Sequence, residues 1–153
     1  MADLVTHRGL YFEEFATGDV AVSAGRTITE ADIVNFAALS GDWNPIHVDA
    51  EFAAKGAFGE RVAHGMLGLS AATGLAIRMG FLEETVIAFM AMDWKFRAPI
   101  KIGDTIHLRA EVGEKRAMPR LGGGFVTFNV ELLNQRDEVC QKGTWQMLVK
   151  LKG

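Results

Sequence analysis

Asp42 and His47 lie five residues apart, in the stretch 39–47 of this sequence. A carboxylate and an imidazole are the side chains best suited to exchange protons near neutral pH. Pro45 stands between them and restricts the backbone, which helps to fix their separation. Taken alone, these residues fit two interpretations. They form either a proton-transfer pair, or an Asn-Pro turn shaped by Asp42 beside a histidine that is packed in the core.

The residues around this pair form a longer motif. Phe36, the string Ser-Gly-Asp at 40–42, the string Asn-Pro-Ile-His at 44–47 and Ala53 follow one another in order. This motif resembles the signature of the MaoC-like dehydratases, the (R)-specific enoyl-CoA hydratase (hydratase 2) group of the hot-dog superfamily. The resemblance extends over most of the chain, from Phe15 onward.

The resemblance implies that Asp42 and His47 are catalytic and that the backbone N–H of Gly65 binds a thioester oxygen. Hydration of an unsaturated thioester needs a base for water, an acid for the α-carbon and donors for the enolate oxygen. Gly65 begins a predicted helix, where free N–H groups and the helix dipole favour negative charge. We expect Ser40 and Asn44 to form the turn and support the reactive groups rather than to react.

Other candidate groups carry less weight. We expect His64 to point elsewhere and to cap or pack, and not to act as a third catalytic group. A metal site built from Asp42, His47, Asp49 and His64 has suitable atoms but no recognised ligand spacing, so no metal is expected. The sequence holds no serine in a Gly-x-Ser-x-Gly elbow, which argues against a nucleophilic triad.

A coenzyme A thioester carries phosphates, so basic residues should flank the mouth of its site. The sequence does not choose among the candidates, which are Arg97, Lys101, Lys115, Arg116 and Arg120. We expect His7 and His107 to be surface or strand residues. Apart from the carrier of the substrate itself, coenzyme A or an acyl carrier protein, no cofactor is implied.

Length and composition predict one domain over residues 1–153, long enough to bury a core. A net charge of −3 without a basic tract argues against a nucleic-acid partner. The single cysteine, Cys140, excludes an internal disulfide. Residues 1–4 lack a signal-peptide pattern, and the apolar stretch 66–77 is too short to span a bilayer, so we expect a cytoplasmic protein that does not enter membranes.

Two helices are predicted to position the motif. A capping-box pattern at residues 29–32 begins an amphipathic helix that Gly41 ends, so the motif starts on the loop after a helix. Asp49 can cap a short helix over 50–55. The stretch 64–77 is apolar nearly all round, which predicts a central helix buried on every side.

The second half of the chain has the period-2 pattern of strands, after one short candidate strand at 20–22. The predicted strands cover residues 86–96, 106–112, 128–132 and 145–151. We expect the first to be buried on both faces at its start and half-exposed later. Short turns between the strands predict an antiparallel meander. The fold class is therefore α+β, with an antiparallel sheet wrapped around a central buried helix, as in the hot-dog fold.

The predicted function is reversible hydration of a trans-2-enoyl thioester to an (R)-3-hydroxyacyl thioester, with one water held by Asp42 and His47. The (R) configuration rests on the resemblance alone. Two alternatives are a hot-dog acyl-CoA thioesterase and a non-catalytic acyl-binding subunit of a hydratase complex. Because hot-dog proteins pair their sheet edges, we expect a homodimer or a higher homo-oligomer.

Overall fold

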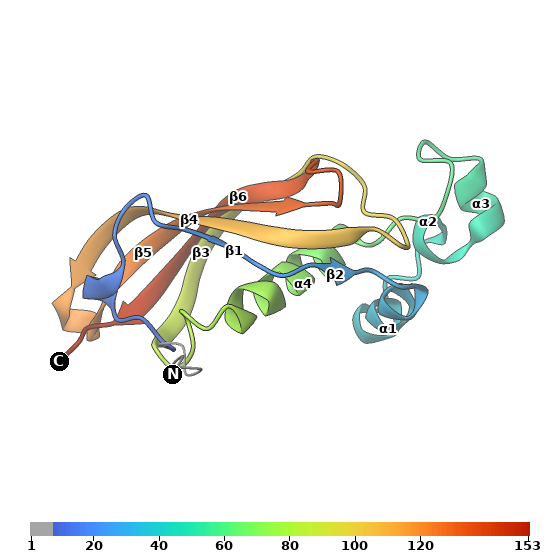
Figure 1. Ribbon diagram of the computed structural model, residues 1–153. Coiled ribbons are helices and arrows are strands. Elements are labelled where there is room, and N and C mark those ends of the chain that lie inside the picture. Colours follow the sequence, from blue (N-terminus) through green and yellow to red (C-terminus); the bar gives the residue numbers. More distant parts are fainter. Residues whose placement is uncertain (1–7) are drawn as a thin grey trace, which may run out of the picture.

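The computed structural model describes residues 8–153, in which an antiparallel sheet lies over one long helix, α4 (Gly65–Arg78) (Figure 1). Three shorter helices gather beyond one end of the sheet: α1 (Glu30–Ser40), α2 (Pro45–Val48) and α3 (Ala50–Ala54). Residues 1–7, which include His7 and the stretch without a signal-peptide pattern, lie outside the described part. The architecture confirms the predicted α+β class.

Six strands form the sheet, in the order β1-β4-β5-β6-β3, with β2 also paired to β4. The two short strands are β1 (Val20–Val22) and β2 (Arg26–Thr27). The long strands are β3 (Val86–Phe96), β4 (Thr105–Met118), β5 (Gly123–Leu133) and β6 (Val139–Lys150). Single turns of 3₁₀ helix cover Phe12–Glu14 and Pro119–Leu121.

The predicted meander is correct for β4, β5 and β6, which are neighbours joined by short turns. It is wrong for β3, which pairs with β6 at the far edge of the sheet instead of lying beside β4. Residues 97–104 therefore connect strands that do not pair with each other. Alternation along a sequence identifies a strand but does not identify its neighbours.

The prediction that β3 is buried on both faces at its start is also wrong. β3 is an edge strand, and most of its large apolar side chains are exposed: Ile87, Phe89, Met90, Met92 and Phe96. Its pairing with β6 is irregular between Val86 and Ala88 and again between Phe89 and Ala91. Such irregularities shift side chains from one face to the other, so the simple alternation did not describe this strand.

Helix α4 is buried along most of its surface, but the prediction that it is buried on every side is wrong. Its buried residues are Leu67, Gly68, Leu69, Ala71, Ala72, Leu75 and Ala76. Met66, Ser70, Thr73 and Ile77 are exposed. Their spacing of three and four residues places them on one stripe of the helix. This stripe is apolar at both of its ends and has no covering segment within residues 8–153.

Helix α1 begins and ends as the sequence indicated. Thr29 and Asp32 form a reciprocal capping box at its start, and Arg26 adds an ion pair of 2.9 Å to Asp32. Burial raises the pKa of Asp32, but hydrogen bonds from Thr29 and Arg26 outweigh it, so the pKa lies below its ordinary value. Gly41 ends the helix at a φ of 78°, in the left-handed region that favours glycine.

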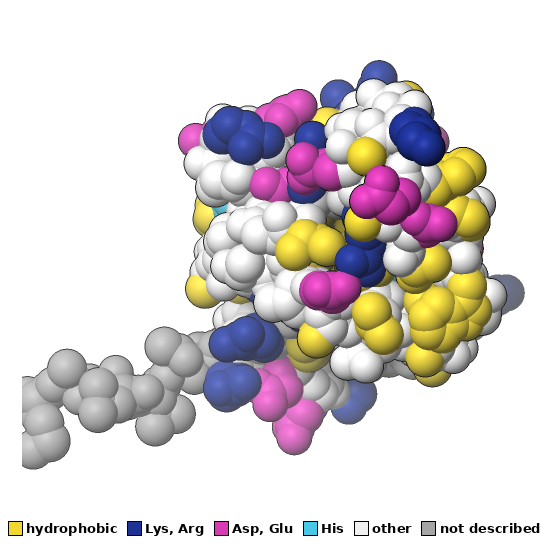
Figure 2. All heavy atoms as spheres, turned by 90° about the vertical axis from the view of Figure 1, so that its right-hand side faces the viewer, with side chains coloured by type: hydrophobic (Ala, Val, Ile, Leu, Met, Phe, Trp, Pro, Cys, Tyr) yellow, Lys and Arg dark blue, Asp and Glu magenta, His cyan; other side chains and the backbone are white. Residues whose placement is uncertain are grey.

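The end of the molecule formed by α1, α2 and α3 is partly apolar on its surface. Figure 2 views this end and shows hydrophobic side chains along one side of the face, among scattered acidic and basic groups. Exposed apolar residues of these segments are Leu39, Trp43, Phe52 and Phe58. Within residues 8–153, none of the helices has the length and apolar character needed to cross a membrane.

Gly68 allows α4 to approach the sheet closely, and this leads to a stability prediction. A Cβ at Gly68 would lie 2.3 Å from Nε2 of Gln141 and 2.9 Å from Cδ1 of Ile100. Gln141 is buried and hydrogen-bonded at both ends of its amide, so it cannot move aside freely. We expect Gly68→Ala to lower the free energy of unfolding by about 1–3 kcal/mol, measured by urea denaturation.

Gly74 provides the matched control on the same helix. A Cβ there would meet nothing within 4 Å, so Gly74→Ala should be neutral or stabilise by roughly 0.4–1 kcal/mol. A Gly68→Ala protein as stable as the parent would contradict the close packing of α4 on Gln141.

Candidate active site

The turn between α1 and α2 carries Asp42, and its own side chains hold it together. The Oγ of Ser40 donates to the Phe36 carbonyl at 2.7 Å and accepts from the Asp42 N–H at 3.1 Å. The Asp42 carboxylate accepts from the Asn44 N–H at 3.2 Å. Asn44 caps α2 by accepting from the Ile46 N–H at 3.3 Å. Ser40 and Asn44 therefore shape the backbone around the acid.

His47 lies in the one-turn helix α2 and not on the loop itself, and it is 7% exposed. Its Nδ1 is 2.7 Å from the carbonyl oxygen of Val62. A carbonyl oxygen only accepts, so Nδ1 carries a proton, and in the neutral imidazole Nε2 holds the lone pair. Arg61 donates to the His47 carbonyl at 2.7 Å and pairs with Glu30 of α1 at 2.6 Å, which fixes the main chain of α2.

The structure brings Asp42 and His47 together. Oδ2 of Asp42 is 3.9 Å from Nε2 of His47, and the Asp42 side chain is 53% exposed while the imidazole is buried. This separation is too long for a direct hydrogen bond, but each atom can lie about 2.8 Å from one shared water. The carboxylate therefore reaches solvent, and the imidazole presents a free lone pair toward it.

His64 also belongs to this group, so the expectation that it points elsewhere is wrong. Its ring is stacked on that of His47, with centroids 3.8 Å apart and planes at 27°. Its Nε2 is 2.8 Å from the main-chain oxygen of Asp42. It does not cap α4 with its side chain. Neighbouring residues on the chain had given no sign that residue 64 returns to the turn at 42.

Gly65 is the first residue of α4 and lies close to Phe96 of β3. A Cβ on Gly65 would lie 2.7 Å from the ring of Phe96, so a side chain there would displace that ring. Its carbonyl accepts from Nε2 of Gln141 at 3.0 Å, and Oε1 of Gln141 accepts from the Trp94 indole at 2.9 Å. An indole N–H only donates, which fixes the orientation of the Gln141 amide.

Sequence reasoning missed Gln141, which is 2% exposed and lines the cavity. A signal was present in the strand pattern. Trp145, Met147 and Val149 mark the core-facing side of β6, and Gln141 occupies the same side two alternations earlier. A polar residue at a core-facing position needs a hydrogen-bond partner, and here it has two.

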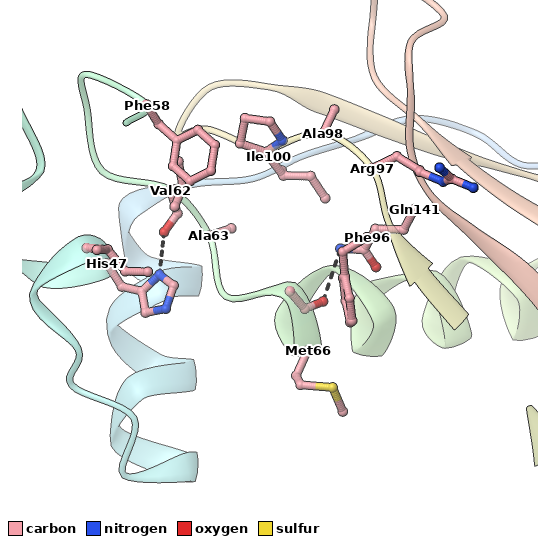
Figure 3. A pocket seen from close by; sticks show the side chains of 13 residues that line it. His47, Phe58, Val62, Ala63, Met66, Phe96, Arg97, Ala98, Ile100 and Gln141 are labelled. Atoms are coloured by element: carbon pink, nitrogen blue, oxygen red, sulfur yellow. Dashed lines mark hydrogen bonds between the residues drawn. The ribbon is translucent and has the colours of Figure 1, made fainter. Parts of the chain in front are cut away.

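A cavity of about 520 Å³ connects His47 with Gly65. Apolar side chains supply much of its wall, including Phe58, Val62, Met66 and Phe96 (Figure 3). The volume and the few polar groups are typical of a small-molecule site. His47 and Gly65 both border this space, as the prediction of one shared site requires.

Among the basic candidates, Arg97 borders the cavity. Lys101 pairs with Glu60 at 3.7 Å. Lys115 and Arg116 instead lie over the rings of Phe12 and Phe125, which do not line it. His107 lies on β4 and faces Asp137 at 3.7 Å.

Ligand-type atoms of Asp42, His47 and His64 lie within 4.8 Å of one another, so a metal ion must be considered. The two imidazoles are stacked, however, and a ring nitrogen binds a metal in the plane of its ring. The stacking therefore does not favour one ion that lies in the planes of both rings. Asp49 takes no part, because its carboxylate caps α3 at 2.9 Å from the Phe52 N–H.

Cys140 offers no reactive thiol beside Gln141. Its side chain is fully buried, and burial together with Glu138 raises the pKa of the thiol to about 11. The thiolate is the nucleophilic form, so it is scarce near neutral pH. Cys140 therefore adds no nucleophile to this site.

Comparison with known proteins gives a family match. A model of the MaoC like domain matches residues 13–131. The chain is 50% identical over 100 residues to Protein MaoC of Klebsiella aerogenes, covering 65% of this chain and 29% of that protein. It is 41% identical over 104 residues to an (R)-specific enoyl-CoA hydratase of Rhodospirillum rubrum, covering 68% of each. It is 38% identical over 107 residues to a 3-hydroxybutyryl-CoA dehydratase of Methylorubrum extorquens, covering 70% of this chain and 66% of that protein.

The aligned segment thus spans less than a third of Protein MaoC and about two thirds of the other two relatives. Among solved structures, a monoamine oxidase regulatory protein from Archaeoglobus fulgius superposes with a TM-score of 0.89 at 38% identity, over 97% of this chain and all of that one. A MaoC-like dehydratase from Rhodospirillum rubrum gives 0.86 at 29%, over 95% and 99%. A Mycobacterium tuberculosis protein with a double hot-dog fold gives 0.81 at 19%, over 94% and 45%, which concerns the fold alone. The predicted hot-dog fold is confirmed.

Proposed function

The chain belongs to the MaoC-like domain family, and from its site we propose that it reversibly hydrates trans-2-enoyl thioesters to (R)-3-hydroxyacyl thioesters. One observation carries the proposal. The Asp42 carboxylate stands 3.9 Å from Nε2 of His47, and His47 and Gly65 both line one largely apolar cavity. Relatives named as an enoyl-CoA hydratase and a 3-hydroxybutyryl-CoA dehydratase support the same reaction class.

The two groups suit a water nucleophile. Nε2 of His47 and the carboxylate of Asp42 are both acceptors, so a water between them donates one hydrogen to each. Its lone pairs are then directed away from both groups, toward a substrate in the cavity. As the water oxygen bonds to the β-carbon, one of its protons passes to His47 or Asp42. Either group lies close enough to the shared water to take this proton, so the role of first proton acceptor is assigned to the pair.

The negative charge that develops on the substrate during this addition appears on the thioester oxygen. The electron pair of the double bond moves to give an enolate, and the N–H of Gly65 is our candidate donor to it. Gly65 stands at the start of α4, where backbone N–H groups lack partners within the helix. The pair then returns a proton to the α-carbon, and the balance is water added across the double bond.

Two other functions use the same fold. A thioesterase would direct water at the carbonyl carbon and release the free carrier thiol. A non-catalytic subunit would bind an acyl thioester without changing it, and the buried His47 beside Asp42 argues against that role. The product formed from crotonyl-CoA distinguishes all three: 3-hydroxyacyl-CoA, free coenzyme A, or unchanged substrate.

We also propose that the protein forms a homodimer through β3. The edge of β3 leaves backbone hydrogen-bonding groups unpaired, and its exposed side chains are largely apolar. Thr73 and Ile77 of the exposed α4 stripe line a small hollow together with Phe89 of β3, so helix and edge form one surface. A second copy of the chain would pair the edge strands and cover this surface. Met66 and Phe96 belong both to this surface and to the wall of the cavity, so the proposed dimer interface lies next to the proposed acyl-thioester site.

The dimer can be measured by light scattering at micromolar concentration. We expect a dimer or larger oligomer for the parent chain and dissociation for Met92→Lys, because a charge on an edge strand opposes pairing. Val22→Lys places the same charge on β1, at the opposite edge, and should leave the mass unchanged. A monomeric parent chain would contradict the proposal.

Replacement of the proton-transfer groups tests their roles. Asp42→Asn keeps size and polarity, and His47→Asn keeps a polar side chain. Both remove proton exchange, so each should reduce the hydration rate on the order of 10²-fold or more. The assay is the loss of the conjugated enoyl absorbance. Asp49→Asn and His107→Asn make the same changes outside the cluster and should keep near-parental turnover. Parental turnover in either site variant would refute the assignment.

Stereochemistry tests the shared water. The Asp42 carboxylate and Nε2 of His47 are 3.9 Å apart and approach the double bond from one side, so hydroxyl and proton should add to the same face. Hydration of crotonyl-CoA in deuterated water, followed by chiral chromatography and NMR, should give the (R) product of syn addition. An (S) product would remove the hydratase 2 assignment, and anti addition would remove the shared-water mechanism.

A further inference from the structure

His64 contacts all three parts of the proposed machinery without having a role in it. Its ring lies against that of His47 at 3.8 Å, and its Nε2 is 2.8 Å from the Asp42 carbonyl oxygen. It directly precedes Gly65 on the chain. Phe36 covers the ring further, with centroids 4.9 Å apart, and the residue is 2% exposed.

Stability of the fold does not explain an imidazole at this position. The side chain makes no capping bond to α4. Its Nδ1 is buried without a hydrogen-bond partner among residues 8–153, which costs stability that a phenylalanine of similar shape would not cost. A buried polar atom left without a partner calls for a specific reason. The contact that a phenylalanine could not make is the one to the Asp42 carbonyl.

The hydrogen-bond partners identify the tautomer of both rings. The carbonyl of Asp42 only accepts, so Nε2 of His64 carries a proton, and in the neutral imidazole Nδ1 holds the lone pair. The buried Nδ1 has no acceptor among residues 8–153, so a lone pair there leaves no unpaired donor. This suits a ring stacked on His47, because a second imidazolium at that distance would oppose proton uptake by His47 during turnover.

We propose that His64 is a positioning residue that sets the separation of the Asp42 carboxylate from Nε2 of His47. Its Nε2–H bond joins the main chain of Asp42 to the segment that enters α4, while its ring supports the face of His47. Asp42 is otherwise held by short-range bonds within its own turn, and its side chain is half exposed. A displacement of about 1 Å at such a pair costs on the order of 10²-fold in rate. This role rests on the proposed hydratase function.

Three substitutions separate the hydrogen bond from the ring. His64→Gln loses the ring but can place an amide N–H where Nε2 stood. His64→Asn has an amide one methylene shorter than that of Gln, so its N–H cannot reach the Asp42 carbonyl oxygen. His64→Phe keeps a stacked ring and loses the donor. We expect kcat on crotonyl-CoA to fall on the order of 10²-fold in the Asn and Phe proteins and to recover to within about 10-fold of the parent in the Gln protein, with KM changed less than about 3-fold throughout.

Thermal unfolding of each variant checks that the fold is intact, and ring ¹⁵N NMR reports the contacts without turnover. In the parent protein we expect the proton of His64 on Nε2 and that of His47 on Nδ1. Equal kcat in the Gln and Asn proteins, parental kcat in the Phe protein, or a proton on Nδ1 of His64 would each overturn the positioning role. A parent protein that hydrates no enoyl thioester would instead overturn the proposed function, and the NMR result would still show whether the hydrogen bond exists.

Discussion

The close approach of α4 to the sheet is the constraint on which the other features depend. It requires a residue without a side chain at Gly68, where the Gln141 amide occupies the space of a Cβ. That amide in turn holds the carbonyl of Gly65 and is itself oriented by Trp94. Buried hydrogen bonds of Gln141 thus hold the first turn of α4 against the sheet. Such bonds are strong because little water competes for them.

Fixing the start of α4 also fixes the segment that leads into it. Val62 pairs with Lys101, and Ala63 donates to the Ile100 carbonyl at 2.7 Å, so this segment follows the connection between β3 and β4. Val62 then supplies the acceptor for Nδ1 of His47, and His64 supplies the donor for the Asp42 carbonyl. One segment, residues 62–64, therefore holds both His47 and the main chain of Asp42.

The same arrangement leaves apolar surface uncovered. One stripe of α4 and the edge strand β3 form one exposed surface. Met66 and Phe96 belong both to this surface and to the wall of the cavity. A protein surface of this kind usually marks an interface. In the proposed dimer, a partner chain on this surface would stand beside the cavity that His47 and Gly65 border.

The sequence by itself determined the local structure: the capping box at Thr29 and Asp32, the end of α1 at Gly41, the strand periods and the turn that carries Asp42. These depend on hydrogen bonds and side-chain patterns within a few residues, so they can be read from short segments. The motif also indicated the family. Only the tertiary structure decided that β3 pairs with β6, that α4 keeps an exposed stripe, and that His64 and Gln141 reach the site. Those outcomes depend on which distant segments pack together, and no local pattern encodes that choice.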